Sequence, residues 1–154
     1  MEKILIVEDD AGIRESLQEI LVLSGFHVST ANNGKQGYES IMEDCPDMVI
    51  CDVNMPELDG FELLGAINQR LKDDVIPPFL FLTAKVEPQD IRQGMSLGAD
   101  DYILKPFNHN EILEIIRMRL DRRKKLIQNG REVVSSQVNS TFDKLALPSE
   151  EGLT

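Results

Sequence analysis

The sequence predicts an α/β fold in which a doubly wound parallel sheet of five strands is followed by an extended C-terminal helical tail. Five short apolar runs, rich in β-branched and aromatic residues, are mostly continuous rather than alternating, as strands covered on both faces are. Segments with apolar residues at three- and four-residue spacing lie between these runs and indicate helices. Strands that alternate with helices in this way favour a parallel sheet.

The first predicted strand is the run KILIV, and four runs of the same kind follow it along the chain. The predicted strands span residues 3–7, 27–30, 47–51, 78–83 and 101–105. After the first strand, a stripe of Ile13, Leu17, Ile20 and Leu21 predicts a helix, and Gly25 marks its end.

Two later helices have equally clear patterns. Phe61, Leu64 and Ile67 form the apolar stripe of one of them. The other spans 88–98, which begins with proline and ends with glycine, the usual asymmetry of a short helix.

The last helical pattern starts near residue 110 and continues beyond the globular domain. Its residues expected to face the sheet are Ile112, Ile115, Ile116 and Leu120. We expect a globular domain over 1–122 and a helical extension with a linker over 123–154. Apolar residues recur at helical spacing after Gly130, so either a helix breaks there and restarts, or one long helix continues as a dimerising coiled coil. The end, LPSEEGLT, is typical of a linker to an output domain beyond Thr154.

Composition and charge argue against several classes of protein. No apolar stretch approaches ~20 residues and the start lacks a secretory pattern, so we expect a cytoplasmic chain without a membrane span. Cys45 and Cys51 fit neither a metal site nor a disulfide framework and are expected to be free thiols. The net charge of −11 argues against sequence-independent binding of nucleic acid by the whole chain. The basic stretch 117–125 is interpreted as the solvated end of a helix, where the helix dipole favours cations, in preference to a nucleic-acid patch.

Polar side chains follow four of the predicted strands, where doubly wound sheets bind their ligands. They are Glu8, Asp9 and Asp10 after the first strand, Asp52 after the third, Thr83 after the fourth and Lys105 at the end of the fifth. Clustered carboxylates repel one another and require a cation, and oxygen ligands without histidine or thiolate suit Mg²⁺. Asp10 is assigned to the cap of the first helix, a position that favours aspartate.

The remaining groups are suited to phosphoryl transfer. Lys105 adds a positive charge and Thr83 adds a hydroxyl donor. A metal ion, an ammonium group and a hydroxyl around one carboxylate would stabilise a transferring phosphoryl group while that carboxylate acts as the nucleophile.

Four segments make the sequence resemble the receiver domain of two-component response regulators, the CheY-like family. They are ILIVEDD (4–10), CDVNMPELDG (51–60), LTAK (82–85) and GADDYILKPF (98–107), in the order and spacing of that family. The resemblance covers residues 2–122 and implies a flavodoxin-like sheet with strand order 2-1-3-4-5. It implies a signalling switch that accepts a phosphoryl group from a histidine kinase or phosphotransfer protein and controls a downstream output. Such a switch assists only its own phosphorylation and dephosphorylation and is not an enzyme acting on an external substrate.

The resemblance also implies roles for the residues of this site. Asp52 is implied to be the phosphoacceptor. Glu8, Asp9 and Asp52, with the backbone carbonyl of Asn54, are implied to hold Mg²⁺. Lys105 is expected to pair with the phosphoryl oxygens.

A second group of implied roles concerns the response to phosphorylation. Thr83 and Tyr102 resemble the switch pair, in which the hydroxyl moves to the phosphoryl group and the aromatic ring follows inward. The peptide bond before Pro106 is expected to be cis. Asn54 and Lys85 are expected to border the path of the water that hydrolyses the phosphorylated form.

Three other interpretations fit the sequence less well. A haloacid-dehalogenase-like phosphatase needs a nucleophile after the first strand and a second aspartate two residues later, but here the strand is the third and the residue is Asn54. A flavin or nucleotide binder would have a phosphate-binding loop where this chain has carboxylates. A degenerate receiver that acts only in docking would have lost Asp52, Lys105 or the acidic pair Glu8 and Asp9, and none is lost.

One departure from the family concerns assembly. Its winged-helix transcription-factor subgroup dimerises through salt bridges between the fourth and fifth helices. Two positions that are basic in that subgroup align with Ile91 and Ile115 of this chain. For a homodimer we therefore favour pairing through the extended last helix. We expect the receiver itself to bind neither membrane nor nucleic acid.

Overall fold

The structure is a computed structural model that describes residues 1–84 and 87–144, with side chains described up to residue 128. The strands are β1 (Lys3–Val7), β2 (His27–Ala31), β3 (Met48–Asp52), β4 (Phe79–Thr83) and β5 (Asp101–Leu104). The helices are α1 (Ala11–Leu23), α2 (Gly34–Glu43), α3 (Gly60–Arg70), α4 (Pro88–Ser96) and α5 (His109–Lys144), with a short 3-10 helix at Asp73–Val75.

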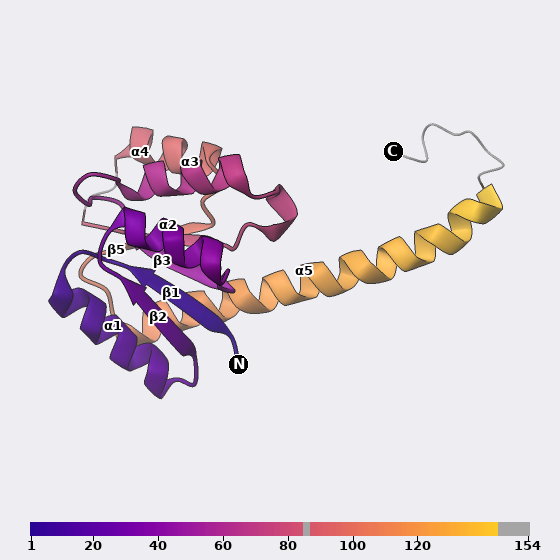
Figure 1. Cartoon of the computed structure of the whole chain (residues 1–154). Coiled ribbons are helices and arrows are strands. Elements are labelled where there is room, and N and C mark those ends of the chain that lie inside the picture. Colours follow the sequence, from indigo (N-terminus) through magenta and orange to yellow (C-terminus); the bar gives the residue numbers. More distant parts are fainter. Residues whose placement is uncertain (85–86, 145–154) are drawn as a thin grey trace. The chain divides into compact units, whose positions relative to one another are not determined.

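The five strands form one parallel sheet in the order β2-β1-β3-β4-β5. Parallel neighbours need crossover connections, and a helix follows each strand. Helices α2, α3 and α4 lie on one side of the sheet and α1 lies on the other (Figure 1). The predicted doubly wound, flavodoxin-like sheet with strand order 2-1-3-4-5 is confirmed.

The predicted strand ends were off by a residue at two places that affect the site. β3 continues to Asp52, which pairs with Leu82 of β4, so this carboxylate ends the strand and does not begin the loop. The reason is that the ladder extends one step further, with the N–H of Val53 donating to the carbonyl of Leu82 at 3.1 Å. β5 ends at Leu104, which leaves Lys105 immediately outside the strand.

Side-chain caps fix the starts of three helices close to the ends of strands. Asp10 accepts a hydrogen bond from the N–H of Ile13 at 3.0 Å, which confirms its predicted role as the cap of α1. Asn33 caps α2 in the same way. Asp59 and Glu62 bond reciprocally to each other's backbone N–H groups and form a capping box at the start of α3.

The sheet is covered on both faces. Successive residues of a strand point to opposite faces, and along β1 Ile4, Leu5 and Ile6 are each at most 1% exposed. One of the two faces packs in a core cluster that includes Phe61 and Phe81, whose rings meet edge to face with centroids 5.1 Å apart. Burial on both faces explains why the strands are continuous apolar runs.

The chain divides into two units, Met1–Ile116 and Arg117–Thr154. Helix α5 runs without interruption through Gly130, so of the two alternatives for this segment the continuous helix is the one observed. Ile112 and Ile116, predicted to face the sheet, are buried, as is the predicted Leu120, while Ile115 is partly exposed. The predicted linker at the end of the chain lies outside the described residues. No helix in the described part is both long and apolar enough to cross a membrane.

Candidate functional site

The ends of four neighbouring strands bring the predicted site residues to one edge of the sheet. Glu8 follows β1, Asp52 ends β3, Thr83 ends β4 and Lys105 follows β5. Because β1, β3, β4 and β5 are consecutive in a parallel sheet, their carboxyl ends meet at the same edge.

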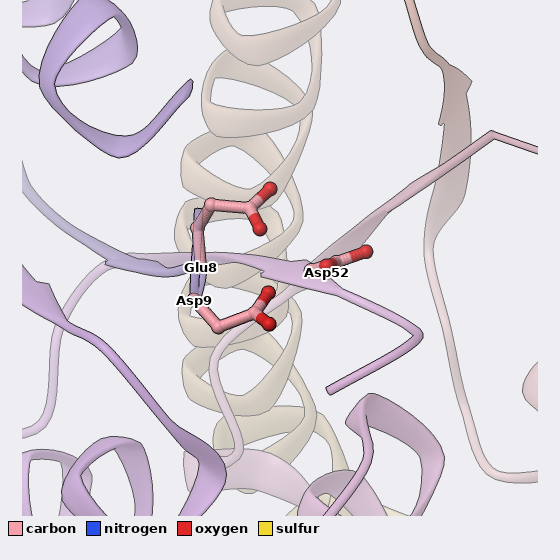
Figure 2. A group of neighbouring side chains, drawn as sticks. All are labelled: Glu8, Asp9 and Asp52. Atoms are coloured by element: carbon pink, nitrogen blue, oxygen red, sulfur yellow. The ribbon is translucent and has the colours of Figure 1, made fainter. Parts of the chain in front are cut away.

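Three carboxylates converge at this edge. One oxygen from each of Glu8, Asp9 and Asp52 can be chosen so that all three atoms lie within 4.8 Å of one another. Glu8 is fully buried, Asp52 is 5% exposed and Asp9 is open to solvent. In Figure 2 the carboxylates of Glu8 and Asp9 point toward the side on which Asp52 lies. The cluster therefore has two buried members and one that remains accessible to water.

Lys105 supplies the neighbouring positive charge. Its Nζ lies 2.8 Å from Oε1 of Glu8 and 3.4 Å from Oδ1 of Asp52. The Lys105–Pro106 peptide bond is cis, as the family resemblance implies. Lys105 contacts two of the three carboxylates, so the cluster has an excess of negative charge when all three are ionised.

Burial dominates the acidity of the two enclosed carboxyl groups. It raises the pKa of Glu8 to about 7, although the hydrogen bond from Lys105 acts in the opposite direction. Burial also raises the pKa of Asp52, against the lowering effect of bonds to Glu8 and Lys105. For Lys105, burial alone would lower the pKa, but its contacts with Glu8 and Asp52 outweigh burial and raise it. The pocket is thus arranged so that ionised carboxylates need an additional cation.

The donor set fits a hard divalent cation. Carboxylate oxygens are the ligands such ions take, and the exposed position of Asp9 leaves room for coordinated water. Asn54, the fourth predicted ligand residue, is exposed in the loop after β3. Together with Thr83 it lines a cavity of about 440 Å³ that extends to α4.

The loop after β3 folds back onto the end of the strand. The N–H of Gly60 donates to the carbonyl of Val53 at 2.8 Å. A Cβ at Gly60 would lie 2.5 Å from the backbone oxygen of Asp52, so only glycine permits this close approach. The loop and the capping box of α3 therefore hold Asp52 at the edge of the sheet.

The predicted switch residues lie on the neighbouring strands β4 and β5. Thr83 is buried at the end of β4. Tyr102 pairs in register with Phe81, with ring centroids 5.7 Å apart, and its hydroxyl donates to the backbone carbonyl of Asp90 in α4 at 3.1 Å. The ring is thus directed toward α4. Lys85, the other residue expected beside the hydrolytic water, lies outside the described residues.

Sequence reasoning missed a second cation next to the acidic pair. Nη1 of Arg14 donates to the backbone carbonyl of Glu8 at 2.8 Å and to that of Asp9 at 3.5 Å. Arg14 comes from the first turn of α1 and reaches back over the loop that carries the two acids. Its acceptors are backbone carbonyl oxygens, which every residue has, so the sequence gives no signal from which this contact could be predicted.

Comparison with known proteins identifies the class to which this fold and site correspond. Residues 4–117 match the family model described as the response regulator receiver domain. The chain belongs to this family, the receiver domains of two-component response regulators, whose function is to accept a phosphoryl group.

Individual relatives agree with that membership. The chain is 37% identical over 141 residues to a probable transcriptional regulator ycf27 of Guillardia theta, covering 92% of this chain and 54% of that protein. It is 41% identical over 122 residues to the response regulator MprA of Mycobacterium leprae, covering 79% and 52%. The chain thus spans about half the length of the curated relatives that it matches.

Solved structures have the same fold. The receiver domain protein (CheY-like) of Methanospirillum hungatei superimposes with a TM-score of 0.76 at 30% identity, covering 81% of this chain and 98% of that chain. The chemotaxis protein CheY4 of Vibrio cholerae gives a TM-score of 0.72 at 31% identity, covering 77% and 98%.

Proposed function

We propose that Asp52 is the residue that accepts the phosphoryl group, from a histidine kinase or a phosphotransfer protein. The observation that carries this assignment is the position of Asp52 at the end of β3. There its carboxylate lies within reach of both Lys105 and the other two acids of the cluster. Glu8 is fully buried and bonded to Lys105, so it is less available to a phosphodonor. Asp9 has no comparable contact with the lysine among the described ion pairs.

Mg²⁺ is the cation we assign to the cluster. Glu8, Asp9 and Asp52 would hold it, with the backbone carbonyl of Asn54 as a further ligand. When bound, it supplies positive charge that draws the phosphoryl oxygens toward Asp52 and offsets the repulsion among the carboxylates.

The transfer itself is a displacement at phosphorus. An Oδ of Asp52 forms the new O–P bond as the P–N bond of the phosphohistidine breaks, and the electron pair of that bond remains on the imidazole nitrogen. Lys105 stabilises charge on the phosphoryl oxygens, and the hydroxyl of Thr83 donates to one of them. Hydrolysis by water later restores the carboxylate. The chain thus assists only its own phosphorylation and dephosphorylation.

The same site is proposed to act as a switch. Movement of the Thr83 hydroxyl toward the phosphoryl group would open space beside Tyr102 on the neighbouring strand, and the ring would occupy it. The surface made by α4, β5 and the first turns of α5 is where a partner would read the change. Ile91 and Ile115 lie on these helices and are partly exposed.

The remaining assignments follow from the family and from the sequence. We infer that residues 1–122 form the receiver, that 123–154 form a helical extension and linker, and that the protein acts in the cytoplasm. Any homodimer is proposed to form through the extension of α5, and the switch is proposed to control a downstream output. The receiver itself is not expected to bind nucleic acid or membrane.

Phosphorylation by a small donor tests the assignment. Incubation with acetyl phosphate and Mg²⁺, followed by intact-mass measurement, should add one phosphoryl group to the wild-type chain and none to Asp52→Asn. EDTA should suppress the reaction, since the carboxylates then lack their cation. Glu15→Gln, an equal change of charge at an exposed position of α1, serves as the matched control and should be labelled like the wild type. Full labelling of Asp52→Asn would overturn the proposal.

A further inference from the structure

The interior of α4 contains a glycine that faces the ring of Tyr102. Gly94 is the one buried residue of this helix. A Cβ at this position would overlap the hydroxyl oxygen of Tyr102, lie 2.8 Å from its Cζ and lie 3.0 Å from Cε1 of Phe61. Real Cβ atoms do not approach other heavy atoms as closely as the first two of these distances. The ring and a side chain at position 94 therefore exclude each other.

Two contacts fix the position of the ring. The hydroxyl of Tyr102 donates to the carbonyl of Asp90, one turn before Gly94 on the same helix. The ring lies against Phe81 of β4 at a centroid distance of 5.7 Å. Burial raises the pKa of Tyr102, as expected for a phenol partly withdrawn from water. These contacts hold the ring against α4.

Glycine is otherwise a poor choice for this position. It is the weakest helix former except proline, because it loses the most backbone freedom on folding. Gly65, in the interior of α3, differs in this respect, since a Cβ there would meet only Cδ2 of Leu97, at an ordinary 3.9 Å. Alanine would fit at Gly65 and would not fit at Gly94 while the ring of Tyr102 lies against α4.

We propose that Gly94 is a positioning residue for Tyr102: the missing side chain is what allows the ring to lie against α4. A side chain at position 94 would displace the ring and break its hydrogen bond to Asp90. This inference rests on the proposed role of Tyr102 as the aromatic member of the switch. It adds that the position of the ring depends on α4 as well as on Thr83.

A double-mutant cycle tests the exclusion without any phosphorylation. Gly65→Ala, which meets no obstruction, should raise Tm by about 2–4 °C as an ordinary helical glycine-to-alanine change. Gly94→Ala should fail to raise Tm in the wild-type background and should raise it in the Tyr102→Ala background. The edge of Phe61 is present in both backgrounds, so the difference between them isolates the contact with Tyr102.

A spectroscopic readout separates displacement of the ring from a general loss of stability. With Tyr38→Phe, Tyr102 becomes the single tyrosine of the chain, and its ionisation can be followed by ultraviolet absorbance. Adding Gly94→Ala should move the raised pKa of Tyr102 back toward its ordinary value, and adding Gly65→Ala should leave it unchanged.

Labelling with acetyl phosphate keeps this inference distinct from the proposed function. Gly94→Ala should accept a phosphoryl group on Asp52 as the wild type does, because position 94 touches none of the carboxylates. If the wild type is not labelled, the proposed function fails whatever the cycle shows. If Gly94→Ala raises Tm as much as Gly65→Ala does and leaves the Tyr102 pKa raised, the ring tolerates a side chain and the inference is wrong.

Discussion

Replacing Glu8 by glutamine should change the stability of the protein by an amount that depends on Mg²⁺. Glu8 is fully buried, and burial raises its pKa from 4.5 to about 7. The folded protein therefore holds this proton more tightly than the unfolded chain does. The stability contributed by Glu8 is fully present below pH 4.5 and is lost as the pH rises through about 7.

The size of the effect follows from the pKa shift. At about 1.4 kcal/mol for each unit of pKa, ionised Glu8 at pH 8 costs the folded state about 3 kcal/mol relative to neutral Glu8. Glutamine has the same shape, carries no charge and still offers Lys105 an oxygen. In EDTA at pH 8, Glu8→Gln should therefore be more stable than the wild type by about 1–3 kcal/mol, the lower figure allowing for a weaker contact with Lys105.

Mg²⁺ should reduce or remove this difference. The wild type gains stability by mass action, about 2.7 kcal/mol when the ion is at 100 times its Kd, whereas Glu8→Gln has lost a charged ligand and gains less. Urea denaturation at pH 5 and pH 8, in EDTA and in Mg²⁺, measures all four free energies of unfolding. The exposed Glu15→Gln is the control for charge alone and should show neither effect.

Two results would refute this reasoning. If Glu8→Gln were less stable than the wild type in EDTA at pH 8, the ionised carboxylate of Glu8 would not destabilise the folded protein as its burial implies. If Mg²⁺ stabilised Glu8→Gln and the wild type equally, Glu8 would not contribute to binding the ion.

Three further changes test other parts of the site. Arg14→Ala removes a charged hydrogen bond to the carbonyl of Glu8 and should lower the free energy of unfolding by about 1 kcal/mol in urea denaturation. Glu57, at φ 69, lies in the left-handed region, so Glu57→Gly should raise that free energy by about 0.5 kcal/mol after the extra entropy of the unfolded chain is allowed for. Asn54→Met should lengthen the lifetime of phosphorylated Asp52 several-fold on Phos-tag gels, because an apolar side chain excludes the hydrolytic water.

Each of these has an outcome that contradicts it. Unchanged stability of Arg14→Ala would show that the hydrogen bond from Arg14 stabilises the folded protein no more than hydration of the Glu8 carbonyl by water does. A less stable Glu57→Gly would mean that the turn is not strained. Decay of the phosphorylated form at the wild-type rate in Asn54→Met would remove this residue from the path of the water.

The order of the sheet and the place of the site could be predicted because both depend on local patterns. Each strand is an apolar run, and the polar residue that follows it marks the edge where a doubly wound sheet binds ligands. That rule alone predicts that Asp52, Thr83 and Lys105 lie at the same edge of the sheet, although it gives no distances between them. The cap role of Asp10 was equally local, since it depends on a helix that begins at the next residue.

The contacts that sequence reasoning missed are those between segments whose spacing depends on packing. Arg14 binds backbone carbonyls, which every residue possesses, so its identity alone does not indicate a partner. The lack of room for a side chain at position 94 beside the ring of Tyr102 depends on the distance between α4 and β5. The end of β3 at Asp52 depended on one more rung of pairing with β4. The low helix propensity of Gly130 was too small an effect to decide whether the last helix breaks there or continues, and in the structure it continues.

The central claim is that phosphorylation occurs on Asp52, and chemical trapping of the acyl phosphate locates it directly. Borohydride cleaves an aspartyl phosphate and converts that residue to homoserine, which peptide mass spectrometry assigns to a position. After treatment with acetyl phosphate and Mg²⁺, we expect homoserine at position 52, with Asp9 and Asp10 unmodified. Homoserine at position 9 or 10 in the wild type, with Asp52 intact, would contradict the account.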